Sequence, residues 1–265
     1  MAQRTATIYS TMNVAYADIR FAVVDVETTG IHPDRDAVVE VACSVVRGGI
    51  ETQSFSSLID PGRPIPARAS AVHHLTAEHL MGQPPLAKIA PIVRRLCAGA
   101  VIVAHNAAFD LAFLPMLRDR PVLCTLRLAR HLFPEFDGHA NQLLRYALET
   151  TGLAGAGAHR ALDDARVTAG VLAVLLRRFT DIQPGATIEG LLAFAAAPII
   201  YPALPFGRYR AKPIADVPIG YLRWLRDRDI DADLQATIEA QLALRDTPVA
   251  NAPATIGASI PMAEI

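Results

Sequence analysis

A short apolar run near the start of the chain, residues 21–24, most constrains how this sequence can fold. Phe-Ala-Val-Val is rich in β-formers and continuously apolar, which is typical of a strand buried on both faces of a sheet. Asp25 and Glu27 lie at the end of this run. Because residues i and i+2 of a strand point to the same side, both carboxylates face one way from the rim of the sheet. A Thr-Thr-Gly sequence then turns the chain sharply.

Paired carboxylates at a strand end require an explanation. Two carboxylates a few ångströms apart repel each other, so either one stays protonated or a cation neutralises both. Oxygen-only ligands suit a hard ion such as Mg²⁺ or Mn²⁺. A solvated strand end followed by a turn is the ordinary explanation of an isolated Asp-x-Glu. The metal hypothesis therefore depends on whether more acids converge on the same rim.

Composition limits the class of protein. With 265 residues, 52% hydrophobic and 19% charged, the chain is long enough for one sizeable core and a small additional module. No apolar run reaches the roughly 20 residues of a membrane-spanning helix, and no apolar secretory segment opens the chain, so we expect a cytoplasmic protein without a membrane partner. Cys43, Cys97 and Cys124 have neither disulfide nor zinc-site spacing. The net charge of -1 argues against non-specific coating of nucleic acid, although a local basic groove remains compatible with it.

The order of the elements predicts an α/β fold around one mixed sheet. Strands are expected over residues 18–26, 37–46 and 51–59 as a meander with the first strand central, and again over 100–104 and 122–124. Three prolines between residues 61 and 66 predict an extended loop, and Thr76 precedes a short helix as its N-cap. Helices are expected over residues 86–97, 107–117, 126–132, 141–148 and 160–178.

Two further acids follow this pattern. Asp110, in His-Asn-Ala-Ala-Phe-Asp, lies early on a helix that follows a buried strand, so it can face the same rim. Asp164, in His-Arg-Ala-Leu-Asp-Asp, opens a long apolar helix, and the glycine-rich residues 151–158 leave His159 on a loop that can move. Taken singly, an acid in a first helical turn is also favoured by the helix dipole, and a lone histidine is more often a surface residue. Together the segments are more specific than any one of them.

These segments resemble a known family. Asp-Val-Glu-Thr-Thr-Gly, His-Asn-Ala-Ala-Phe-Asp and His-Arg-Ala-Leu-Asp-Asp are similar to the three motifs of the DEDDh 3′-to-5′ exonucleases, which include the epsilon subunit of DNA polymerase III. The resemblance covers residues 19–179 and implies a ribonuclease H-like fold, with a mixed five-stranded sheet flanked by helices. It implies that four acids and one general base are catalytic, and it leaves Asp163 outside the site. The residues carried over are Asp25, Glu27, Asp110, Asp164 and His159.

The resemblance also implies a cofactor and a mechanism. Two divalent ions, Mg²⁺ or Mn²⁺, about 3.5 to 4 Å apart stabilise the attacking and leaving oxygens of an in-line displacement. Asp25 would bridge the ions, Glu27 and Asp164 would complete one site, and Asp110 would support the other. His159, neutral near pH 7, would take a proton from the attacking water.

Substrate contacts are expected around the same motifs. Thr28 and Thr29 are candidates to hold the terminal 3′-OH, and Phe109 and His73 are candidates to stack on or wedge the last bases. A core role for Phe109 remains open. His73 belongs to a Val-His-His-Leu-Thr stretch, which resembles the family's segment between motifs one and two, except that His74 replaces its more usual glycine.

The composition changes after the exonuclease domain, which we place at residues 18–180. A second module is expected over residues 187–245, and a disordered tail over 246–265. Between residues 201 and 230, six Lys and Arg stand against three Asp, interleaved with aromatic residues. This stretch resembles the C-terminal module of exodeoxyribonuclease X-like proteins. It fits contact with phosphates and bases, or a solvated face over a small core.

The sequence thus predicts a metal-dependent 3′-to-5′ exonuclease that releases nucleotides from DNA 3′ ends in DNA repair or proofreading. DNA is favoured because the second module resembles that of a DNA exonuclease. The expected partners are nucleic acid 3′ ends and a DNA polymerase or repair complex. Two alternatives remain open: an exoribonuclease that trims RNA, and a non-catalytic, polymerase-associated subunit that binds nucleic acid.

Overall fold

The structure is a computed structural model that describes residues 16–150 and 159–246. The glycine-rich residues before His159 and nearly all of the expected tail lie outside these ranges. The chain divides between Ala197 and Pro198 into two compact units.

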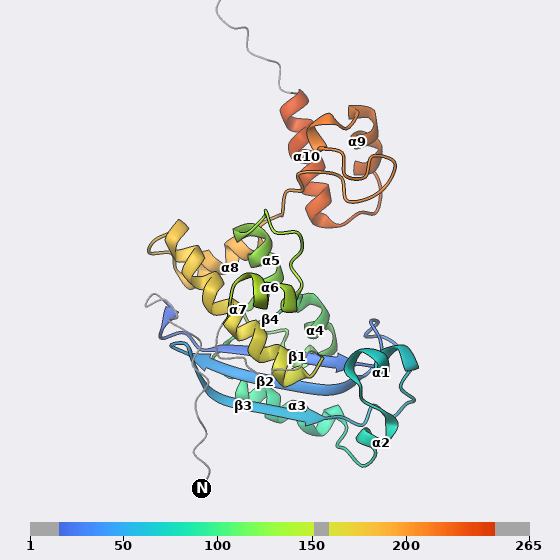
Figure 1. Ribbon diagram of the computed structural model, residues 1–265, viewed down its shortest axis with the longest axis vertical. Helices are drawn as coiled ribbons and strands as arrows, with labels where there is room; N and C mark the ends of the chain where they lie inside the picture. Colours follow the sequence, from blue (N-terminus) through green and yellow to red (C-terminus); the bar gives the residue numbers. More distant parts are fainter. Residues whose placement is uncertain (1–15, 151–158, 247–265) are drawn as a thin grey trace, which may run out of the picture. The chain divides into compact units, whose positions relative to one another are not determined.

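The first unit contains a mixed five-stranded sheet in the order β3-β2-β1-β4-β5 (Figure 1). Its strands are β1 (Phe21–Thr28), β2 (Val38–Arg47), β3 (Ile50–Leu58), β4 (Val101–Ala104) and β5 (Val122–Cys124). β1 and β3 run antiparallel to β2, whereas β4 runs parallel to β1 and β5. The expected meander and the central position of the first strand are confirmed.

Helices cover both faces of the sheet. They are α1 (Ala67–His73), α2 (Ala77–Leu80), α3 (Leu86–Leu96), α4 (Ala107–Phe113), α5 (Thr125–Leu132), α6 (Asn141–Ala147), α7 (Ala161–Ile182) and α8 (Ile188–Ala196). Phe21 and Val23 of β1 belong to the core beneath α5, α7 and α8, while Ala22 and Val24 belong to the core beneath α3 and α4. Burial on both faces explains why the β1 run is continuously apolar.

Two local features differ from the sequence prediction. The helix expected over residues 107–117 stops at Phe113 and resumes as a 3₁₀ turn, Pro115–Leu117, because the residue before a proline is disfavoured in the α region. The loop expected after the prolines contains α1, which begins directly after Pro66.

The second unit has its own small core. It contains a 3₁₀ turn (Ile214–Asp216), α9 (Ile219–Arg226) and α10 (Ala232–Asp246), which enclose apolar residues such as Leu222 and Ile238. α8 lies in the first unit and contributes Leu191 to its core, so the structural division comes later than the module boundary expected at residue 187. Among the described helices, none is both long and apolar enough to cross a bilayer.

Candidate active site

The acids predicted from the three motifs converge at one end of β1. Asp25 and Glu27 come from β1, Asp110 from α4, and Asp164 from the first turn of α7. Together with His159 they line a single cleft of about 410 Å³. Residues more than a hundred positions apart in the sequence thus meet because β1 is central, β4 leads directly into α4, and α7 packs on the sheet.

Hydrogen bonds fix two of these acids. The backbone N–H of Val26 donates to Asp110 Oδ1 at 3.1 Å, which ties α4 to β1 between the two β1 acids. Gln142 Nε2 donates to Asp164 Oδ1 at 2.9 Å, and the backbone N–H of His159 donates to Asp164 Oδ2 at 2.6 Å. Both oxygens of Asp164 are therefore oriented by donors from the flanking segments.

Burial raises the pKa values of all four carboxyl groups, and repulsion by neighbouring acids adds to this effect for Asp25 and Glu27. Burial raises the pKa of Asp25 well above its usual range, and the charges of Asp110 and Asp164 raise it further. Burial followed by the charge of Asp164 raises the pKa of Glu27 to about 8. Burial likewise raises the pKa of Asp110, which is only 3% exposed, to about 7, and it raises that of Asp164. Such a cluster is neutralised either by protons or by cations.

His159 borders the same cluster from an exposed turn. It adopts a left-handed backbone conformation with φ 62°, which is unusual for a residue other than glycine. Glu27, His159 and Asp164 each offer a ligand atom, and these atoms lie within 4.8 Å of one another. The imidazole is thus close enough to exchange a proton with a water molecule held by these acids.

The residues expected to contact the substrate differ in whether their side chains face the cleft. Phe109 lines the cleft and also packs against Phe113 with ring centroids 5.2 Å apart, so it serves the core and faces the site. The Thr29 hydroxyl accepts from the Ala37 N–H at 3.0 Å and contacts Asp36, so its side chain is used to hold the turn. The Thr28 hydroxyl donates to the Gly30 carbonyl at 2.6 Å.

His73 does not have the exposed position that stacking on a base requires. Its side chain is 1% exposed, and Nδ1 accepts from the Leu75 N–H at 3.0 Å. The expected contact between this ring and the last bases therefore disagrees with its burial. The residues around His73 in the sequence give no signal of this, because histidine occurs at both buried and exposed positions.

Two other residues at the cleft hold the acidic segments in place. His105 Nδ1 lies 3.0 Å from the Thr125 hydroxyl and its Nε2 lies 2.8 Å from the His139 carbonyl, while burial lowers its pKa to about 4. A neutral imidazole with both nitrogens engaged can fix the backbone of the second motif. Gln142 carries no sequence signal, because nothing distinguishes a glutamine near a helix start until its partner is known.

The chain is similar in sequence to DNA polymerase III proteins. The epsilon subunit of DNA polymerase III from Treponema pallidum is 36% identical over 169 residues, which cover 60% of this chain and 78% of that protein. The PolC-type DNA polymerase III of Streptococcus thermophilus is 32% identical over 178 residues, which are 64% of this chain but 12% of that protein. This chain therefore spans only a small part of some of its relatives.

A solved structure has the same fold. The structure of exonuclease X in complex with 5′ overhanging duplex DNA matches with a TM-score of 0.56 and 29% identity, covering 67% of this chain and 99% of the other. Residues 196–238 match a family described as a putative quorum-sensing-regulated virulence factor. The expected likeness of the second module to that of exodeoxyribonuclease X-like proteins stays a prediction.

A family model assigns the first unit. The Exonuclease family, RNase_T, matches residues 22–172, which is more than half of the chain. These residues contain all four acids and His159, and the fold that carries them agrees with the ribonuclease H-like architecture expected from the motifs. The chain therefore belongs to the exonuclease family, in its DEDDh group.

Proposed function

We propose that this protein is a metal-dependent 3′-to-5′ exonuclease that releases nucleotides from DNA 3′ ends by two-metal-ion hydrolysis. The observation that carries the proposal is the convergence of four carboxyl groups and one histidine on a single cleft. Burying acids together is unfavourable unless protons or cations compensate them. A hard divalent cation, Mg²⁺ or Mn²⁺, matches this set of oxygen donors.

The residues present fit two divalent ions. Asp25, whose pKa is raised by the charges of the other three acids, would contact both ions, Glu27 and Asp164 would complete one site, and Asp110 would support the other. Bound ions of this kind stabilise the charge on the attacking and leaving oxygens of a phosphodiester. The raised pKa values support the assignment, since cation binding relieves the repulsion that makes these acids hold protons.

The chain's own groups would orient the reaction. His159, next to Glu27 and Asp164, would accept the proton of the attacking water as general base. Phe109, which lines the cleft, would contact the terminal base. The Thr28 and Thr29 hydroxyls support the turn beside the site, so contact with the terminal 3′-OH would come through the backbone of this segment.

DNA is the favoured substrate. A solved relative of 29% identity is named as a complex with duplex DNA, and the similar polymerase subunits are named for DNA synthesis. These names support a role in DNA repair or proofreading, with a DNA polymerase or repair complex as partner. RNA trimming is the alternative within the same chemistry.

The decisive experiment uses 5′-labelled DNA and RNA oligonucleotides, single-stranded and duplex. We expect a ladder of DNA products that shorten from the 3′ end, that needs Mg²⁺ or Mn²⁺ and that disappears in EDTA. Faster shortening of RNA would support the exoribonuclease. Binding without cleavage of either polymer at any divalent ion concentration would support the non-catalytic alternative.

We also propose that the second unit contacts nucleic acid. Trp224 is 48% exposed and stacks on Tyr221 with centroids 5.3 Å apart. Arg228 lies 4.7 Å over the Trp224 ring, and Arg208 and Lys212 flank Tyr209. Cations interleaved with aromatic rings fit phosphates and unstacked bases.

A further inference from the structure

Glu40 is a buried carboxylate beside the acidic cluster. It lies on β2 directly opposite Glu27 of β1 and is 1% exposed. The pairing of the two strands is irregular immediately after this position, between Glu27 and Thr28. Because Glu40 adds another negative charge next to an acid-rich site, its burial calls for compensating donors.

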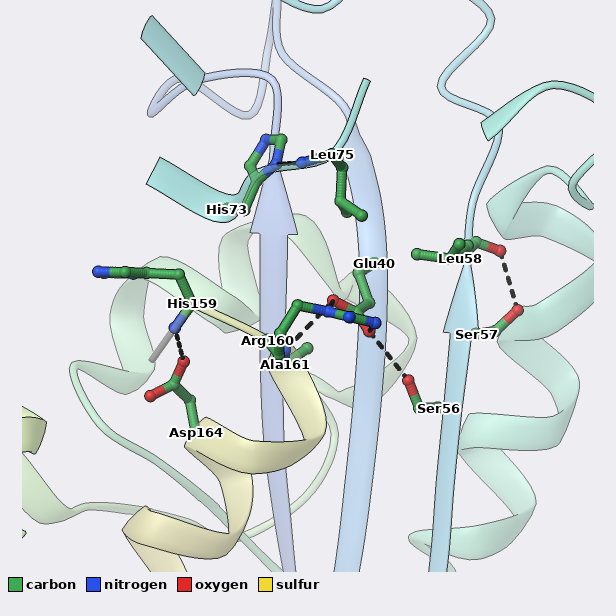
Figure 2. Close-up of polar contacts among 10 residues, drawn as sticks. All are labelled: Glu40, Ser56, Ser57, Leu58, His73, Leu75, His159, Arg160, Ala161 and Asp164. Atoms are coloured by element: carbon green, nitrogen blue, oxygen red, sulfur yellow. Dashed lines mark hydrogen bonds and ion pairs between the residues drawn. The ribbon is translucent and has the colours of Figure 1, made fainter. Parts of the chain in front are cut away.

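Four donors meet the two oxygens of Glu40, and most come from the start of α7 (Figure 2). Arg160 forms a two-pronged ion pair, with Nε 3.2 Å from Oε2 and Nη2 3.1 Å from Oε1. The Ala161 N–H donates to Oε2 at 3.3 Å, and the Ser56 hydroxyl donates to Oε1 at 3.2 Å. Both oxygens of Glu40 thus accept hydrogen bonds, and Glu40 is not among the residues that line the cleft of the four acids.

These contacts hold the segment that carries His159. Arg160 follows His159 directly, and Ala161 is the first residue of α7. On its other side, His159 donates its backbone N–H to Asp164 Oδ2 at 2.6 Å. The left-handed backbone of His159 is therefore held between a contact to a proposed metal ligand and a contact to the sheet. Figure 2 shows Glu40 and Asp164 on either side of this turn.

We propose that Glu40 is a positioning residue, which fixes the first turn of α7 through Arg160 and Ala161 and thereby sets the place of His159 over Glu27 and Asp164. The inference rests on the proposed nuclease function. A glutamine at this position keeps one acceptor but loses the two-pronged ion pair, so the turn gains freedom while Arg160, which is half-exposed, can reach solvent.

The molecule contains a matched control. Glu51 of β3 makes the same two-pronged pair with Arg166 of α7, with both N···O distances at 2.9 Å, and it also accepts from the Ser44 hydroxyl at 3.0 Å. This second pair joins the same helix to the same sheet but lies outside the residues that line the cleft. A variant of Glu51 therefore loses a comparable sheet-to-helix tie without loosening His159.

The experiment compares Glu40→Gln with Glu51→Gln in the full chain, by single-turnover cleavage of a DNA oligonucleotide and by thermal denaturation. We expect Glu40→Gln to lower the cleavage rate by about 10- to 100-fold, the effect of misplacing a catalytic group by about 1 Å. The Mg²⁺ concentration at half-maximal rate should change little, because the four acids remain and Gln142 still orients Asp164 by its own hydrogen bond. The affinity for the oligonucleotide should also stay close to that of wild type, since Glu40 does not line the cleft. Glu51→Gln should keep the wild-type rate even if it lowers the denaturation midpoint equally.

A double-mutant cycle tests the route of the effect. If Glu40 acts through His159, adding Glu40→Gln to His159→Ala should cost no further rate. If Glu40→Gln does not fold, Arg160→Lys, which keeps the charge and removes the paired donors, should give the same pattern. Additive losses, a weakened Mg²⁺ response, or an equal loss in Glu51→Gln would overturn the inference. Wild-type activity in Glu40→Gln would overturn the role of Glu40 and leave the proposed function intact. An inactive wild-type protein would overturn both.

Discussion

Asp25 receives repulsion from every other acid of the cleft, and this makes it the most informative single residue. We expect Asp25→Ala to abolish nucleotide release, because it removes the carboxylate that we propose contacts both ions. Its thermal stability without metal should equal or exceed that of wild type, since the variant relieves burial and repulsion of charge. Asp163→Ala, a change of the neighbouring acid that we place outside the site, is the control and should keep activity. Wild-type cleavage by Asp25→Ala would contradict the metal assignment.

Glu27 makes the metal-free protein sensitive to pH. Its pKa of about 8 lies above the usual 4.5, so the folded chain binds this proton more tightly than the unfolded chain does. The contribution of this proton to the free energy of unfolding is fully present below about pH 4.5 and is lost as the pH rises through about 8. Asp110, with a pKa of about 7, acts in the same direction. In EDTA, the thermal denaturation midpoint should therefore decrease as the pH is raised from 5 to 8.

Two measurements check this dependence. Saturating Mg²⁺ should restore the midpoint at pH 8, because a bound cation replaces the protons. Glu27→Gln in EDTA should give a flatter curve than wild type, since the amide does not titrate. A thermal midpoint in EDTA that rises from pH 5 to pH 8 would contradict the expectation that ionisation of Glu27 and Asp110 destabilises the metal-free fold.

His159 allows chemistry to be separated from ion binding. Loss of a general base costs on the order of 10² to 10⁴ in rate, whereas the carboxylate ligands remain in His159→Ala. We expect single-turnover cleavage to fall by this factor while calorimetric Mn²⁺ affinity stays nearly unchanged. If metal affinity disappeared together with activity, His159 would act as a ligand or as a structural residue.

At the scale of elements, α6 orients a proposed ligand from outside the three motifs. Gln142 donates to Asp164 Oδ1 at 2.9 Å. Loss of such an outer partner typically costs about 10- to 100-fold in metal affinity or activity, and we expect this for Gln142→Ala. Tyr146→Ala, a change of an exposed residue on the same helix, should leave the Mg²⁺ response unaltered. Equal Mg²⁺ dependence in the two variants would mean that α7 alone positions Asp164.

The elements are predictable from sequence where a local pattern determines them. The run before Asp25 predicts a strand because its burial on both faces requires continuous apolar residues, and α7 follows from helical spacing. The end of α4 and the start of α1 both depend on a proline. The residue before Pro115 leaves the helical conformation, whereas Pro66 directly precedes a helix, so prolines have opposite effects at these two positions. The Glu40 and Gln142 contacts join positions far apart in the chain, so no local pattern could predict them.

At the scale of the whole molecule, the division at Ala197 separates the proposed chemistry from the cationic and aromatic surface of the second unit. All residues that line the cleft belong to the first unit. A chain ending at Ala197 should therefore still shorten short oligonucleotides in an Mg²⁺-dependent manner. The same chain should bind long single-stranded DNA more weakly than the full chain, because it lacks Arg208, Arg210 and Lys212.

The salt dependence of binding distinguishes phosphate recognition from a stabilising role of the second unit. Removing one cation that pairs with a phosphate lowers the slope of log affinity against log salt by roughly 0.7 to 0.9, so the removal of three is measurable. In the full chain, changing Arg208, Arg210 and Lys212 together to Ala should reproduce this change of slope with the fold retained. Quenching of Trp224, the single tryptophan, would report stacking of a base on its exposed ring. If both chains bind a long single strand equally at every salt concentration, the second unit instead serves protein association or stability.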